Sequence, residues 1–74
     1  YWFARGNDDA LAGRHAAAAR AFARSAAALP TREAYYNEAL AHELAGEPEL
    51  AIVAFESYLG LELTERGLPP DAAD

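Results

Sequence analysis

The chain has 74 residues, which allows one domain at most, and 53% of them are apolar. Alanine makes up 20 of these 39 apolar residues, so only 19 large apolar side chains can contribute to a core. Such a thin core suits closely packed helices, because Ala is the best helix former and lets backbones approach. One Val, one Ile and two Thr exclude most sheet proteins, and a large enclosed catalytic cavity is excluded too. We therefore expect an all-α fold.

The composition also bears on where the protein works. The absence of Cys excludes disulfides and Cys-based zinc sites. No apolar run approaches the roughly 18–20 residues that span a bilayer, and no signal peptide is recognisable, so a cytoplasmic location is the default expectation. The start at Tyr1-Trp2-Phe3, without Met, favours an excised piece of a longer protein. Six Arg without any Lys, together with the excess of Ala, indicate a bacterial source.

The charges are divided unevenly along the chain. Residues 1–32 carry five Arg against two Asp, a net charge of +3, whereas residues 33–74 carry one Arg against ten acidic residues, a net charge of −9. The acidic second half disfavours binding of DNA or RNA, because it repels phosphate. We expect an acidic, electrically polar protein with a basic front and an acidic back.

The strongest pattern in the sequence is an internal repeat that relates position i to position i+33, a shift that we call the repeat offset. Leu11-Ala12-Gly13 falls on Leu44-Ala45-Gly46, and Phe22 falls on Phe55. The repeat offset also relates Ala18 to Ala51, Ala21 to Ala54, Trp2 to Tyr35 and Phe3 to Tyr36. A period of about 20–50 residues is typical of stacked supersecondary units.

Each repeat predicts two helices, and the four helices are expected over about 2–12, 14–29, 32–45 and 48–65. Gly13 and Gly46 mark the turn inside each pair, and Thr31 is a good N-cap for the third helix. The segment Gly6-Asn7-Asp8 could break the first helix. A rival interpretation therefore starts that helix at Asp8 and leaves residues 1–5 as a loose arm, but the repeat offset favours the longer helix.

These residues resemble the tetratricopeptide repeat (TPR) family. Its pattern has an aromatic anchor, a small residue four positions on, a Gly break, an Ala followed four residues later by an aromatic, and a closing Pro. The first unit supplies Trp2, Gly6, Gly13, Ala18, Phe22 and Pro30, and the second supplies Tyr35, Ala39, Gly46, Ala51 and Phe55. The chain departs from the pattern at Arg5 and Glu38, where the family prefers Leu, at Leu63, where the closing Pro would stand, and in its slightly short period.

The resemblance implies two antiparallel helix hairpins that form a short right-handed α-solenoid fragment of a longer array. The TPR-like domain would span 1–66, with repeats at about 1–31 and 32–66, followed by a Pro-containing tail over 67–74. It also implies a scaffold for protein–protein interaction. No catalytic motif contradicts this: His42-Glu43 begins like a HExxH zinc motif but lacks the second His. We expect both His15 and His42 to be structural, and neither enzymatic activity nor a cofactor.

The resemblance further implies that the first helix of each unit lines a concave side. Phe3, Asn7 and Leu11 follow at helical spacing along one such helix, and Tyr36, Leu40 and Leu44 along the other. We expect a groove for an extended peptide or an amphipathic helix, with the candidate residues Phe3, Asn7, Tyr36, Asn37, Leu40 and Glu43. The alternative is that Leu11 and Leu44 are interior and only Phe3 and Tyr36 are exposed.

The two asparagines of the groove raise one more possibility. In some TPR proteins, Asn at the places of Asn7 and Asn37 helps to clamp the C-terminal carboxylate of a peptide. Phe3 stands where the first Lys of that clamp would be, and an acidic groove disfavours an acidic tail. We therefore do not expect a carboxylate clamp.

A second hypothesis follows from the physics of stacked repeats. About three units are usually needed to bury the faces between them, whereas two are present here. The open end of the second unit would expose Phe55, Tyr58 and Leu59 for self-association or for packing against the rest of a parent protein, unless the residue 64–74 tail covers it. The charge division predicts head-to-tail contact between copies that weakens with salt.

Overall fold

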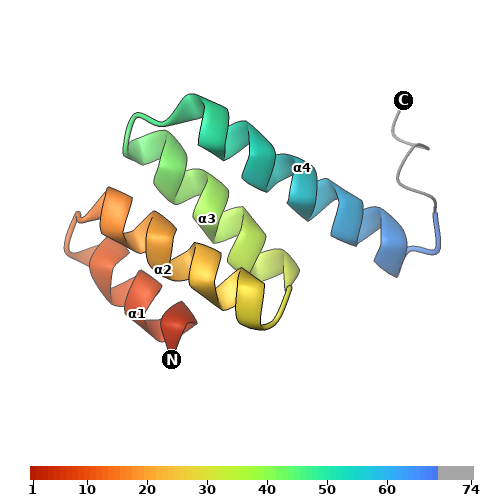
Figure 1. The fold of residues 1–74 in the computed structure, drawn as a ribbon, viewed down its shortest axis with the longest axis horizontal. Coiled ribbons are helices and arrows are strands. Elements are labelled where there is room, and N and C mark those ends of the chain that lie inside the picture. The colour runs from red at the N-terminus through yellow and green to blue at the C-terminus, as the bar shows by residue number, and fades with distance from the viewer. Residues whose placement is uncertain (69–74) are drawn as a thin grey trace.

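The structure is a computed structural model that describes residues 1–68, and it consists of four α-helices joined by short turns (Figure 1). The helices are α1 (Trp2–Leu11), α2 (His15–Ala28), α3 (Arg32–Leu44) and α4 (Pro48–Glu65). Residues 1–68 contain no strand, so the predicted all-α class is confirmed. Every helix begins and ends within one residue of its predicted range, and the loose arm of the rival interpretation is wrong because α1 starts at Trp2. Residues 69–74 of the predicted tail lie outside the described residues.

The helices follow one another in space in the order of the chain. α1 packs on α2, α2 on α3 and α3 on α4 (Figure 1). The Cα atoms extend over 37 × 25 × 15 Å, so the molecule is elongated and thin. α1 and α4 thus lie at the two ends of the row, and the only helix against which α4 packs extensively is α3.

The turn within each hairpin has the same structure. Gly13 and Gly46 adopt positive φ angles of 80° and 77°, which only Gly adopts without steric cost. The next residue then caps the helix, as in a Schellman motif: the backbone N–H of Arg14 donates to the carbonyl of Asp9, and that of Glu47 to the carbonyl of His42, both at 2.8 Å. The expected glycine breaks are confirmed, and they recur at the repeat offset.

The core is built almost entirely from alanine. The buried apolar residues among those described are nine Ala and Phe22. Ala18, Ala19 and Phe22 of α2 form a cluster with Ala41 of α3, and Phe3 and Ala10 of α1 pack against it. Small side chains here allow the helix backbones to lie close together.

The aromatic packing also repeats between the hairpins. The rings of Phe3 and Phe22 meet edge to face with centroids 5.6 Å apart, and those of Tyr36 and Phe55 meet in the same way at 6.1 Å. The repeat offset relates both residues of the first pair to those of the second. The internal repeat is therefore present in the packing as well as in the sequence.

Candidate interaction surfaces

An exposed apolar stripe runs along α3. Tyr36, Leu40 and Leu44 lie one helical turn apart, and they are 44%, 37% and 67% exposed. Leu11 of α1 is 89% exposed. The alternative that placed Leu11 and Leu44 in the interior is therefore wrong.

A shallow pocket of about 220 Å³ adjoins this stripe. Three of the six predicted groove residues, Asn7, Asn37 and Leu40, line it, and Leu44 does so as well. Because the pocket takes its walls from α1, α2 and α3, it depends on how the two hairpins meet. The structure thus brings half of the predicted groove residues together at one site.

His15 lines this pocket although it was not among the predicted groove residues. It is the first residue of α2, and it lines the same pocket as Asn7. Its Nδ1 atom is buried and has no hydrogen-bond partner within residues 1–68. The only sequence signal for this placement was its position directly after the Gly13 turn.

The remaining three predicted groove residues, Phe3, Tyr36 and Glu43, lie elsewhere. Phe3 is half-buried because it packs on Phe22, so it supports the core more than it lines a groove. Glu43 is exposed on α3 and does not line the pocket. Tyr36 lines a second, more open pocket of about 420 Å³ with Tyr58, at the N-terminal end of α3.

Tyr36 connects the predicted groove to the predicted self-association surface. Its ring lies 6.1 Å from that of Phe55 and 5.6 Å from that of Tyr58, measured between centroids. Phe55 and Tyr58 are both half-buried, and Leu59 is 50% exposed. The two surfaces therefore meet at one aromatic cluster.

We expect Glu62→Gln to lower the pKa of Tyr58. The negative charge of Glu62 raises this pKa above its ordinary value of 10.0, with a smaller contribution from burial, and both favour the neutral phenol. Because the folded chain holds this proton more firmly than the unfolded chain, stability should fall as the pH rises through the tyrosine range. The Tyr58 ring signals in an NMR titration would measure the shift. An unchanged Tyr58 pKa in Glu62→Gln would contradict this account of the cluster.

The far side of α4 exposes aliphatic residues that no other described helix covers. Ile52 and Leu59 are 59% and 50% exposed. Their counterparts at the repeat offset, Ala19 and Ala26, are buried on the side of α2 that faces α3. Ile52 was not among the predicted self-association residues, although its relation to Ala19 could have identified it.

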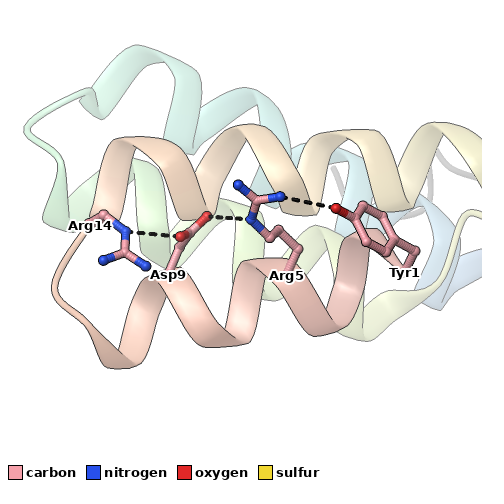
Figure 2. A network of polar contacts seen from close by, with 4 residues as sticks. All are labelled: Tyr1, Arg5, Asp9 and Arg14. Carbon is pink, nitrogen blue, oxygen red and sulfur yellow. Dashed lines mark hydrogen bonds and ion pairs between the residues drawn. The ribbon is translucent and has the colours of Figure 1, made fainter.

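A polar network lies along α1 and crosses the first turn (Figure 2). Asp9 is buried, and its Oδ1 accepts a hydrogen bond from Nε of Arg14 at 3.0 Å. Nε of Arg5 lies 4.0 Å from the other carboxylate oxygen, and Nη1 of Arg5 donates to the hydroxyl of Tyr1 at 3.0 Å. One acidic residue thus joins two arginines across the hairpin.

The second hairpin has a polar network at the same positions, in which a histidine lies between two glutamates where the first hairpin has an aspartate between two arginines. His42 is buried at the position equivalent to Asp9, and its Nδ1 and Nε2 lie 3.0 and 3.4 Å from oxygens of Glu47 and Glu38. The repeat offset relates Arg5 to Glu38 and Arg14 to Glu47. The network accounts for the polar residues at positions 5 and 38, where the TPR pattern has Leu. It also places His42 in a structural role.

Neither a membrane helix nor a metal site is found in residues 1–68. No helix there is sufficiently long and apolar to cross a bilayer, and no three His, Asp or Glu side chains are grouped so that they could hold a metal ion. No family model, curated protein or solved structure matches the chain.

Proposed function

We propose that the protein is a TPR-type interaction module that binds an extended peptide or an amphipathic helix of another protein along α3. The observation that carries this proposal is the exposed stripe of Tyr36, Leu40 and Leu44 beside a pocket with Asn7 and Asn37 in its walls. Apolar side chains of a ligand would cover the stripe. The two amides can both donate and accept, which suits the backbone of a peptide.

The charges beside the stripe indicate which ligand it would select. Glu33 and Glu43 are exposed on the same side of α3, and neither has an ion-pair partner within the described residues. Carboxylates at the rim of a groove favour basic partners and raise the association rate at low salt. The preferred ligand therefore combines apolar residues with Lys or Arg.

The proposal can be tested with a phage-displayed library of random peptides. We expect the protein to enrich apolar peptides that carry Lys or Arg, and we expect Tyr36→Ala or Leu40→Ala to weaken the enriched peptides at least about tenfold, or ~1.4 kcal/mol. Leu50→Ala is the matched control, because Leu50 is 50% exposed on α4, away from the pocket. Unchanged circular dichroism would establish that the variants fold. Failure to enrich any peptide, or equal binding by groove and control variants, would contradict the proposal.

A second candidate function is self-association through α4. It is favoured by the exposure of Ile52 and Leu59 at positions whose counterparts in the first hairpin lie beneath α3. An uncovered face of this kind belongs to a protein whose fold is completed by another helix.

A further inference from the structure

The first hairpin provides a template for what should cover α4. The face of α2 that contains Ala19, Phe22 and Ala26 receives α3, and Ala19 and Phe22 cluster there with Ala41. The repeat offset maps this face onto Ile52, Phe55 and Leu59 of α4, which we call the α4 face. Because the α4 face has the same helical geometry as its counterpart, it suits another helix of the kind that α3 presents to α2.

Small residues stand at regular intervals on the side of α3 that contains Ala41, which packs on α2. Ala34 and Ala41 are fully or almost fully buried and stand one heptad apart, and Ala45 follows one turn later. Glu38 lies between the two buried alanines and is half-buried. The requirement for a helix seated on the α4 face is therefore small residues at positions i, i+7 and i+11, with a polar residue tolerated at i+4.

The first helix of a second copy does not meet this requirement. The repeat offset places Tyr1 at the position of Ala34 and Asp8 at the position of Ala41. Simple continuation of the stack would press a carboxylate against Phe55 and Ile52, and burial of an unpaired carboxylate in an apolar contact is costly. This excludes α1 as the inserting helix.

The outer side of α2 does meet it. Ala16, Arg20, Ala23 and Ala27 stand at i, i+4, i+7 and i+11, as Ala34, Glu38, Ala41 and Ala45 do on α3. Arg20 and Ala27 are exposed, and Ala16 and Ala23 are half-buried. The outer side of α2 thus offers a small, flat surface with Arg in the place of Glu38.

The charges of the two surfaces are complementary. α2 contains two arginines and no acidic residue, whereas α4 contains four glutamates and no basic residue. Glu56 stands one residue beyond Phe55 and is exposed, and neither Glu56 nor Arg20 has an ion-pair partner in the described part of the chain. Contact between two α4 faces would instead bring acidic helices together.

We propose that the α4 face of one copy receives the outer side of α2 of a second copy. This proposal rests on the second of the two proposed functions, and it identifies the partner surface. The contact is heterologous, because it joins two different surfaces. Each pair of copies therefore keeps one free α2 side and one free α4 face, and further copies can add to form a chain. A closed dimer forms instead if two copies make both contacts with each other. The contact is also sensitive to salt, because Arg20 and Glu56 meet at its edge.

A mixing experiment tests which surfaces meet. One variant, Ile52→Glu with Leu59→Glu, disrupts contact through the α4 face. The other variant, Arg20→Glu with Ala27→Glu, disrupts contact through the outer side of α2. All four residues are exposed, so circular dichroism should show intact helices. By light scattering, the wild type should exceed its monomer mass of 7.9 kDa increasingly with concentration and less so at high salt, whereas each variant alone should stay monomeric. Their equimolar mixture should form a heterodimer and nothing larger, because a single intact contact remains.

Three results would overturn the proposal. The wild type could remain monomeric up to millimolar concentration at low salt, the α2 variant could associate as strongly as the wild type, or the mixture of the two variants could remain monomeric. The second result would indicate contact between two α4 faces. None of the four substituted residues lines the pocket that contains Asn7 and Asn37, so both variants should still capture peptides. Failure of the self-association proposal can therefore be distinguished from failure of the peptide-binding proposal.

Discussion

Phe22→Ala is expected to lower the free energy of unfolding by about 3–5 kcal/mol. Phe22 is 2% exposed and is the only large side chain among the buried apolar residues of the described chain. It joins all of the first three helices, because it packs with Ala41 of α3 and against Phe3 of α1. A domain of this size has about 4–11 kcal/mol of stability in total. Urea denaturation followed by circular dichroism should therefore find a much lower unfolding midpoint for this variant than for the wild type.

Phe55→Ala is the matched control for this prediction. Phe55 occupies the same place in the second hairpin, but it is only half-buried because none of the described helices lies on the α4 face. Its truncation should cost about 1–2 kcal/mol when measured at low concentration and high salt, where self-association is suppressed. Equal costs for the two phenylalanines would contradict the asymmetry between the hairpins.

The repeat could not predict that Phe22 and Phe55 differ in burial. Helix positions depend on local chemistry, such as Gly at a positive φ and Thr at an N-cap, and the sequence therefore located all four helices. Indeed the side chain of Thr31 accepts the hydrogen bond from the backbone N–H of Ala34, as an N-cap does. Burial depends on neighbours in space. Phe22 and Phe55 share the alanines one and four residues before them, but the packing of α3 on α2 buries only Phe22.

In the candidate groove, too, some features follow from local sequence and others depend on contacts between helices. Helical periodicity placed Leu40 and Leu44 on one stripe of α3 but left open whether Leu44 is interior, and the structure shows that both are exposed. It could not place His15 in the pocket or move Phe3 into the core, because both outcomes depend on contacts between α1 and α2. Whether Asn7 and Asn37 share a site likewise depends on how the hairpins meet.

The polar network was within reach of the sequence in principle. Arg5 and Glu38 looked like departures from the family pattern when each was considered alone. Compared at the repeat offset, Arg5 and Glu38 are equivalent members of two polar networks, one around Asp9 and one around His42. The polar contacts are kept although each of their residues differs between the two hairpins, so a comparison of single positions misses them.

Gly6→Ala should destabilise the protein although it improves helix propensity. A Cβ atom built at Gly6 lies only 2.7 Å from carbons of the Phe22 ring, and Phe3 and Ala41 hold that ring in place. Overpacking of this kind costs about 1–3 kcal/mol, which exceeds the gain of up to about 1 kcal/mol from replacing a helical Gly with Ala. We expect a net loss of about 1–2 kcal/mol in urea denaturation.

Gly60→Ala measures the gain in helix propensity without a steric clash. Gly60 is inside α4, and a Cβ atom there would meet nothing within 4 Å, so this change should stabilise the protein by about 0.5–1 kcal/mol. In a Phe22→Leu background the ring is gone, and Gly6→Ala should then lose most of its cost. Gly6→Ala should lower stability and Gly60→Ala should raise it, because Gly6 lets α1 approach α2 closely whereas a Cβ atom at Gly60 meets nothing within 4 Å. If Gly6→Ala stabilised the protein as much as Gly60→Ala does, the close contact between α1 and Phe22 would not exist in solution.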